Sequence, residues 1–261
     1  MREQVGIVPI GVVENDALDV ADVPSEGLPS RVRVFDQYTP ALEGIQVGDH
    51  MYILAEFDQA DATVLRGSPG TVQQRGAFSI RSSSRPNRIG LTLSRATAIE
   101  GPLLALEWLD FSNGSPVLDL KPYNWRWECV LSARRQDRRF IERQLPLESL
   151  QRVFERPAAN FHGERCDAVQ RCAELSARLV HEFDVWIGDP HLRWTVRADG
   201  HVIDAIQGLT GATLGNGRLS LPDGAWRDSA EAVEVEVEAA GGGYRLRGRH
   251  SHSSWVLDRL R

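Results

Sequence analysis

Short runs of β-branched and other apolar residues recur along the first half of the chain, separated by turn residues. They lie at residues 5–13, 31–35, 50–57, 88–98, 103–109 and 116–121. Turn signals such as Glu100-Gly101-Pro102 and Ser112-Asn113-Gly114 fall between them. No stretch of this half has the length or period of a long amphipathic helix. Many short strands at such spacing favour an antiparallel barrel or sandwich.

The pattern changes after about residue 130. Residues 131–145 are charged and predicted to be part helix and part connection, and residues 146–160 read as a short helix followed by a linker. Within 164–183, apolar positions recur at spacings of four and three, which is typical of an amphipathic helix. These positions are Ala168, Cys172, Leu175, Leu179 and Phe183.

A β-hairpin is predicted near the end of the sequence. The alternating segments VEVEVE (233–238) and YRLRGR (244–249) flank three glycines at 241–243, which form a permissive turn. The second half is therefore expected to be α+β. We expect the boundary between the two halves to fall within 130–160.

Composition narrows the class of protein. The 261 residues, 42% of them hydrophobic, can form one large or two small domains with buried cores. No apolar run approaches the length that crosses a bilayer. Three cysteines, Cys129, Cys166 and Cys172, are too few for a disulfide scaffold. We therefore expect a cytoplasmic protein rather than a secreted or membrane-spanning one.

Charge is distributed unevenly, although the net charge is only −6. Residues 1–61 carry three arginines against twelve acids, a local net of −9, whereas residues 62–99 carry six arginines and no acid. This arginine segment is either a surface for an anion or nucleotide, or a solvated loop paired with the acidic region. Lys121 is the one lysine among 30 basic residues.

Two segments carry most of the chemical signal, RGAFSIRSSSRPNRIGLTLSR (75–95) and LDFSNGSPVLDLKPY (109–123). The first is a turn-rich loop of Arg, Ser and Asn that enters a strand, and the second is an Asn-Gly turn followed by a strand. Pro86 stiffens the first loop, and Gly90 permits close approach of a ligand or a neighbouring chain segment. Rigid polar loops on a barrel are common places for binding residues.

These two segments resemble the hallmarks of the TsaA/TrmO-like family of S-adenosylmethionine (SAM)-dependent methyltransferases, an RGxFxxRSxxRPNPIGLS-like stretch and a DGTPVLDIKPY-like stretch. Weaker similarity extends over residues 5–127. The resemblance implies that residues 1–130 form a small antiparallel β-barrel that binds SAM, in a homodimer with the cofactor near the interface of the two copies. Characterised members methylate N6 of threonylcarbamoyladenosine in the tRNA anticodon loop.

The resemblance also implies site residues. Those carried over to the SAM site are Asp58, Gln59, Arg81, Arg85, Pro86, Asn87, Leu91, Asp110, Phe111 and Ser112. The candidate catalytic residues are Asp119, Lys121 and Tyr123, which would position the substrate or support the site. The alternative is structural, in which Asp119 and Lys121 brace a barrel strand.

Three departures from the family pattern affect the substrate. Arg88 stands where the family has a proline, and Asn113 stands where it has an acid. Residues 14–30 carry five acids and no base. Such a surface repels a polyanion, so tRNA is a less secure expectation than SAM.

The second half resembles the FmdE-like family, which takes its name from a component of formylmethanofuran dehydrogenase and several members of which bind zinc. The segments FHGERC (161–166) and DAIQGLTGATLGNGRL (204–219) carry this resemblance. It is degenerate, since Glu164 replaces a histidine and Ala212 a cysteine. We therefore expect a helical connection over 131–160 and a degenerate FmdE-like α+β domain over 161–261.

Neither an anion site nor a metal site follows securely from these segments. His162 and Cys166, four residues apart, can share one face and ligate a soft metal, but two ligands do not make a site. No metal is therefore predicted. The TGATLGNG stretch (210–217) can in principle hold an anion through backbone N–H groups.

Three functions remain open from the sequence. The first is methyl transfer from SAM to modified adenosine in tRNA. The second uses SAM on a small molecule, including intramolecular alkylation of its aminocarboxypropyl arm to a cyclopropane amino acid with release of methylthioadenosine. The third is a non-catalytic module that senses SAM or a metal.

Overall fold

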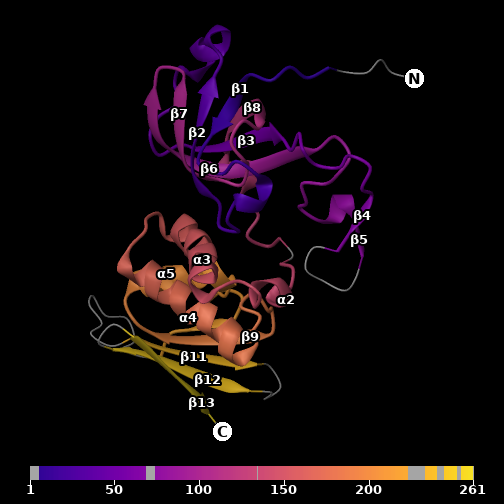
Figure 1. Ribbon diagram of the computed structural model, residues 1–261. Coiled ribbons are helices and arrows are strands. Elements are labelled where there is room, and N and C mark those ends of the chain that lie inside the picture. The colour runs from indigo at the N-terminus through magenta and orange to yellow at the C-terminus, as the bar shows by residue number, and fades with distance from the viewer. Residues whose placement is uncertain are drawn as a thin grey trace. The chain divides into compact units, whose positions relative to one another are not determined.

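The chain forms two compact units, Met1–Val130 and Leu131–Arg261. The structure is a computed structural model that describes residues 6–68, 74–133, 135–222, 233–239, 244–251 and 254–260 (Figure 1). In this described part of the chain, no helix is both long and apolar enough to cross a membrane.

The first unit is a closed barrel of six strands in the order β1-β2-β7-β6-β3-β8 (Figure 1). The strands are β1 (Gly11–Glu14), β2 (Leu28–Val34), β3 (His50–Glu56), β6 (Ile89–Glu100), β7 (Leu103–Leu109) and β8 (Pro116–Pro122). Every neighbouring pair is antiparallel. The predicted antiparallel β-barrel is therefore confirmed.

Alternation of side chains fills the barrel. On β3, Met51, Ile53 and Ala55 point inward and are buried, while the residues between them are half-buried on the outer side.

The first predicted strand is wrong in extent: β1 begins only at Gly11, and the residues before it include the exposed Ile7 and Val8. The smaller elements are the 3-10 helices at Val20–Asp22, Asp36–Leu42 and Ala77–Ser79, the two-stranded sheet of β4 (Arg66–Gly67) and β5 (Arg75–Gly76), and α1 (Trp125–Glu128).

Gly90 allows two phenyl rings to pack over the start of β6. The rings of Phe57 and Phe111 lie with centroids 5.0 Å apart. A Cβ atom on Gly90 would lie 2.4 Å from one ring carbon of Phe111 and 2.6 Å from one of Phe57. The two rings thus occupy the space of the missing side chain and join the end of β3 to the start of β6.

The second unit is an α+β layer. Its sheet has the order β10-β9-β11-β12-β13, in which only the β9–β10 pair is parallel. Helices α3, α4 and α5 cover one face of this sheet (Figure 1). The bounds are α2 (Arg139–Glu142), α3 (Leu147–His162), α4 (Asp167–Phe183), β9 (Leu192–Arg197), α5 (Gly200–Thr210), β10 (Leu219–Ser220), β11 (Val233–Ala239), β12 (Arg245–Ser251) and β13 (Ser254–Leu260).

The helix predicted at 164–183 matches α4, but two segments differ from their predictions. Residues 146–160 belong to one 16-residue helix, α3, rather than a short helix and linker. Its buried residues Leu150, Phe154 and Ala158 recur every four positions and belong to the core of the unit, so the helix continues through Pro157. In addition, residues 204–210, for which no helix was predicted, lie in α5, whose N-cap is Asp199.

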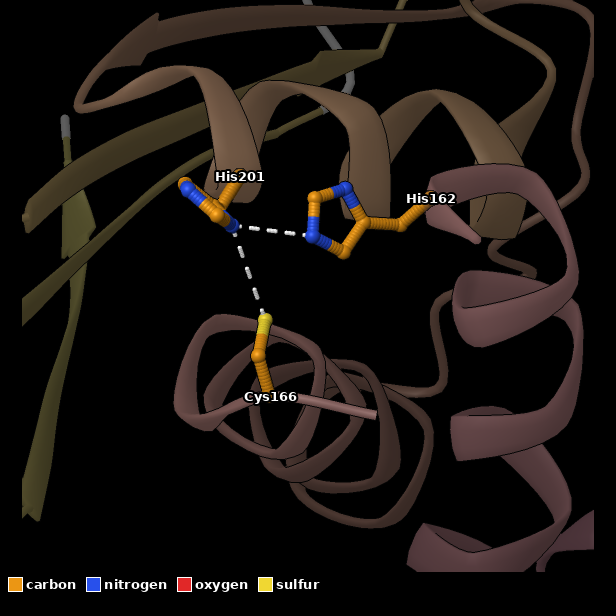
Figure 2. A group of neighbouring side chains, drawn as sticks. All are labelled: His162, Cys166 and His201. Atoms are coloured by element: carbon orange, nitrogen blue, oxygen red, sulfur yellow. Dashed lines mark hydrogen bonds between the residues drawn. The ribbon is translucent and has the colours of Figure 1, made fainter. Parts of the chain in front are cut away.

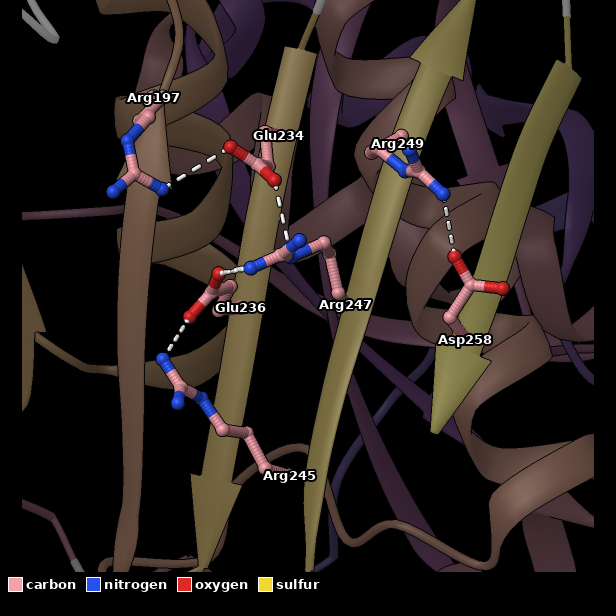
Figure 3. Close-up of polar contacts among 7 residues, drawn as sticks. All are labelled: Arg197, Glu234, Glu236, Arg245, Arg247, Arg249 and Asp258. Carbon is pink, nitrogen blue, oxygen red and sulfur yellow. Dashed lines mark hydrogen bonds and ion pairs between the residues drawn. The ribbon is translucent and has the colours of Figure 1, made fainter. Parts of the chain in front are cut away.

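The predicted hairpin corresponds to β11 and β12, while the three glycines of its turn lie outside the described residues. The valines of β11 are buried beneath the helices, and its glutamates face the opposite side of the sheet. There Glu236 binds Arg245 and Arg247 at 2.5 and 2.6 Å, and Glu234 binds Arg197 and Arg247, both at 3.1 Å (Figure 3). Cross-strand pairs of opposite charge therefore hold the outer face together.

Glu236 is the buried member of this network, with only 6% of its surface exposed. Burial alone would raise the pKa of Glu236, but hydrogen bonds from Arg247 and Arg245 outweigh it and lower the pKa below the ordinary value. A carboxylate with a lowered folded-state pKa stabilises the fold above its unfolded pKa, about 4.3 for Glu. This stabilisation is lost as the pH falls through the folded-state pKa.

We therefore expect Glu236→Gln to lower the free energy of unfolding at pH 7 by about 1 to 3 kcal/mol, because it removes the charge that the arginines bind. The loss relative to wild type should shrink as the pH falls below about 4.3. Urea denaturation at several pH values measures this. The matched control is Glu238→Gln, an exposed glutamate on the same strand and face. Equal pH profiles for the two variants would contradict the assignment.

A second prediction concerns Gly90. Gly90→Ala should lower the free energy of unfolding by about 1 to 3 kcal/mol, because the new methyl group has to displace both phenyl rings. Gly76→Ala is the control, since a Cβ there has no heavy atom within 4 Å. Chemical denaturation of both variants checks the difference, and equal stability would show that the rings yield without cost.

Candidate functional site

The segment 75–95 forms one side of an open cleft of about 450 Å³ at the start of β6. Six of the ten residues predicted for cofactor binding line this cleft. They are Arg81, Arg85, Pro86, Asn87, Leu91 and Asp110. The volume lies within the usual range for small-molecule sites.

A tight turn places the polar residues of the segment. The N–H of Arg88 donates to the carbonyl of Arg85 at 3.0 Å, and Asn87 has a φ of 66°. Pro86 at the second position and a positive φ at the third are the features of a type II turn. Arg88 itself has a φ of 52°, which the ring of a proline cannot adopt. Arg88, which stands where the family pattern has a proline, can therefore adopt this backbone conformation, whereas a proline could not.

The Arg88 side chain ties this turn to the end of β3. Its guanidinium lies 2.6 Å from the carboxylate of Glu56 and donates to the carbonyl of Asp58 at 2.9 Å. The carbonyl of Arg88 accepts from the N–H of Phe57 at 2.9 Å. Three contacts thus hold the turn against the barrel. The interpretation of the arginine segment as pairing with the acidic region holds for Arg88.

Two other arginines of the segment, Arg81 and Arg85, bind backbone carbonyl groups. Arg81 donates to the carbonyl of Leu91, and Arg85 donates to the carbonyl of Ile80 at 3.5 Å. Among the described residues, no carboxylate lies within ion-pair distance of either guanidinium. Their positive charges therefore remain available to an anionic group in the cleft.

Asp110 supplies a negative charge to the same cleft. It follows the last residue of β7, and its carboxylate accepts a hydrogen bond from the hydroxyl of Thr92, which is buried on β6. The cleft thus combines the guanidinium groups of Arg81 and Arg85, which have no carboxylate partner among the described residues, with the carboxylate of Asp110, which Thr92 holds in place. This arrangement suits a small ligand that carries both an acid and a positive charge.

Apolar residues that the sequence analysis did not single out complete the cleft. Most of them lie inside the segment 75–95, so the choice of this segment as a binding loop could have included them. The exception, Phe57, directly precedes the predicted site residue Asp58. These residues are Phe57, Phe78, Ile80, Ser82, Ser83 and Ile89, the serines being the polar members. Gly90, which the sequence analysis did name, also lines the cleft. Aromatic faces such as those of Phe57 and Phe78 suit a planar base or a cation.

Four residues predicted for the cofactor site do not line the cleft. Asp58 and Gln59 are exposed beyond the end of β3, where the carbonyl of Asp58 accepts a hydrogen bond from Arg88. Phe111 is fully buried beside Gly90 and Phe57, so it supports the floor from below. Ser112 is 2% exposed, with its hydroxyl 3.4 Å from that of Ser115.

The three candidate catalytic residues lie on and just after β8. Lys121 Nζ is 2.8 Å from Asp119 Oδ2, and both side chains are on the outer side of the barrel. Leu54 pairs with Leu91 on one side and with Asp119 on the other. Asp119 is therefore two strand spacings, about 10 Å, from the cleft residue Leu91. Asp119 also lines a separate cavity of about 480 Å³.

Tyr123 follows this strand and packs edge-on against Tyr52, with ring centroids 5.9 Å apart. Burial, followed by the interaction with Cys129, raises the pKa of Tyr123. Burial likewise raises the pKa of Tyr52, which the positive charge of Arg81 partly opposes. Both phenols are thus protonated at neutral pH and act as hydrogen-bond donors rather than bases.

In the second unit the structure brings His162 and Cys166 together with a third residue, His201 (Figure 2). His201 Nδ1 lies 2.9 Å from His162 Nε2 and 3.9 Å from Cys166 Sγ. The sequence analysis missed His201 because it is 35 residues beyond Cys166, where no local spacing connects them.

The anion-binding interpretation of the loop after α5 does not hold. The N–H of Thr213 donates to the side chain of Asn216 at 2.9 Å, and the N–H of Asn216 donates to the hydroxyl of Thr213 at 3.2 Å. Arg218 binds the carbonyl of Gly211. These N–H groups are satisfied inside the loop, and the loop presents its carbonyl groups to an arginine.

Comparison with known proteins concerns mainly the barrel. A family model described as the tRNA-methyltransferase O N-terminal domain matches residues 21–129. An S-adenosyl-L-methionine-binding protein of Archaeoglobus fulgidus is 38% identical over 127 residues, which cover 47% of this chain and 91% of that protein. The human tRNA (adenine(37)-N6)-methyltransferase is 36% identical over 97 residues, 36% of this chain and 22% of that protein.

A longer alignment reaches beyond the barrel. A second Archaeoglobus fulgidus protein, named a probable S-adenosyl-L-methionine-binding protein, is 28% identical over 221 residues, or 80% of this chain and 59% of its own length. An alignment of that extent includes part of the second unit, because the first ends at Val130. The matched family model lies within the barrel unit, and the relative that is 38% identical is covered almost completely. The chain belongs to the family of the tRNA-methyltransferase O N-terminal domain.

Proposed function

We propose that the barrel unit binds SAM in the cleft and transfers its methyl group to a nucleophile. The observation that supports this most directly is the pair of guanidinium groups, on Arg81 and Arg85, that face the cleft without a carboxylate partner in the described chain. The names of the relatives, SAM-binding proteins and a tRNA adenine methyltransferase, agree with it.

The donor set fits SAM group by group. Arg81 and Arg85 suit its carboxylate through charge-assisted hydrogen bonds. Asp110, held by Thr92, suits its ammonium or sulfonium charge. Phe57 and Phe78 offer faces for the adenine ring. Asn87 can both donate to and accept from a nucleoside.

SAM supplies an electrophilic methyl carbon together with its leaving group. The chain therefore has to align the acceptor, exclude water and receive the proton that the acceptor loses. We assign the proton to Asp119, because Tyr123 is protonated at neutral pH and Lys121 is held in the ion pair with Asp119. The acceptor would then lie over the outer barrel face between Leu91 and Asp119.

The first candidate acceptor is N6 of an adenosine in tRNA, threonylcarbamoyladenosine by the resemblance. The arginine segment 62–99 carries six positive charges and no negative one, which suits a phosphate backbone. The second candidate is a small molecule, and the local charge of −9 over residues 1–61 favours it, since this region repels a polyanion. The homodimer and the FmdE-like nature of residues 161–261 stay predictions.

Calorimetry with SAM tests the cofactor site. We expect the wild-type chain to bind SAM and Arg81→Ala to bind it about 10- to 100-fold more weakly, because a charge-assisted hydrogen bond is lost. Arg31→Ala is the matched control, an exposed arginine on β2 that does not line the cleft. Circular dichroism confirms that each variant is folded. Absence of SAM binding by the wild type, or equal losses in both variants, would refute the proposal.

Turnover tests the reaction and the acceptor. Incubation with SAM and tRNA that lacks the N6-methyl group should yield S-adenosylhomocysteine, and the rate should fall steeply with salt; methylthioadenosine as product would indicate chemistry on the aminocarboxypropyl arm instead. Asp119→Asn should lower kcat by about 10²- to 10⁴-fold and leave SAM affinity within about 2-fold. An unchanged kcat would remove Asp119 from proton transfer. Turnover of a small acceptor without salt dependence would favour the second candidate.

A further inference from the structure

Three helix ends of the second unit meet at one point. His162 is the last residue of α3, Cys166 is the N-cap of α4, and His201 lies in the first turn of α5. Gly163, with a φ of 101°, ends α3 and lets the chain turn directly into the segment that carries Cys166. The mutual packing of the three helices therefore fixes the relative positions of the three side chains.

The donor atoms of these side chains face one another (Figure 2). His162 Nε2, Cys166 Sγ and His201 Nδ1 all lie within 4.8 Å of each other. The measured edges are 2.9 Å between the two nitrogens and 3.9 Å between Sγ and His201 Nδ1. Around a tetrahedral zinc ion, bond lengths of about 2.05 Å to nitrogen and 2.3 Å to sulfur give edges of about 3.3 and 3.6 Å. These two edges therefore differ from the ideal values by less than about half an ångström, and the third edge, between His162 Nε2 and Cys166 Sγ, is at most 4.8 Å.

A carboxylate orients His162 for this role. Asp204 lies one turn after His201 on α5, and its Oδ2 is 3.2 Å from His162 Nδ1. Because a carboxylate only accepts, the Nδ1 atom of His162 carries the proton, and the lone pair of Nε2 points toward His201 and Cys166. A carboxylate that binds the distal nitrogen of a histidine is the usual support of a metal ligand.

The site is accessible and incompletely ligated. The side chain of His162 is only 9% exposed, but Cys166 is half-buried and His201 is exposed, so an ion can enter from solvent. The carboxylate of Glu164, 68% exposed, lies 4.0 Å from His162 Nε2 and is near enough to interact with a bound ion or its water. Three protein ligands with a fourth position open to water are characteristic of reactive rather than structural zinc sites.

We propose that His162, Cys166 and His201 form a binding site for a divalent transition metal ion of the zinc class, with Asp204 as the residue that positions His162. A thiolate with two imidazoles favours zinc, or its spectroscopic substitute cobalt(II), over magnesium and calcium, which prefer oxygen ligands.

Cobalt(II) titration of the chelator-treated, untagged full chain tests the site. We expect one equivalent to bind, with a thiolate-to-cobalt charge-transfer band and the visible bands of a tetrahedral ion, and zinc to displace it. Cys166→Ser, nearly isosteric and therefore expected to fold, should abolish the charge-transfer band. His201→Ala should weaken zinc binding by about 100-fold or more in competition with a chromophoric chelator. Asp204→Asn should weaken it by about 10- to 100-fold.

Matched controls separate this site from binding elsewhere. Cys129→Ser removes an exposed thiol in the first unit, and His191→Ala removes an exposed histidine in the second, and neither should alter the titration. Absence of a charge-transfer band in the wild type would overturn the proposal, as would its persistence in Cys166→Ser. In either case the contact between the two histidines would be a hydrogen bond that serves helix packing alone.

Discussion

The absence of a side chain at residue 90 determines where β6 can begin. Phe57 and Phe111 fill that space and join the end of β3 to the start of β6. With the two strands in this register, Ala55 pairs with Gly90 and Glu56 with Ile89. The Arg88 side chain then reaches the carboxylate of Glu56, and the turn that precedes β6 is held against the barrel. Arg85 and Asn87 of the cleft owe their positions to this packing, because they lie on that turn.

The barrel was predictable because its strands are short β-rich runs separated by turn residues, and both features are visible in the sequence. The predictions at 50–57 and 103–109 differ from β3 and β7 by at most one residue. The strand predicted at 5–13 is wrong in extent because a strand needs a partner as well as apolar residues. Among the described residues, the paired register with β2 covers Gly11–Glu14 alone. Residues 146–160 stay helical through Pro157, since burial of Phe154 and Ala158 outweighs one missing hydrogen bond.

The candidate sites show where local sequence stops being informative. Five of the six predicted residues that line the cleft lie within residues 81–91, so their proximity follows from the chain itself. Asp110 follows a different strand, β7, and is linked to β6 by its hydrogen bond with Thr92. Phe57 and Phe78 were not predicted because an apolar residue near a strand is usually expected to be part of the hydrophobic core. His201 and Asp204 join His162 through the packing of α5 on α3, which no spacing along the chain encodes.

The arginines discussed above fall into two groups, those paired with carboxylates and those that contact backbone carbonyl groups. On the outer face of the second sheet, Arg245, Arg247 and Arg249 lie beside carboxylates of neighbouring strands (Figure 3). In the cleft, Arg81 and Arg85 are held only by backbone carbonyls among the described residues, which fix their direction without neutralising their charge. Guanidinium groups positioned in this way have lost side-chain freedom without gaining an ion pair. Binding of an anionic ligand would offset that cost, which is why we propose the cleft, rather than the charged sheet, as the small-molecule site.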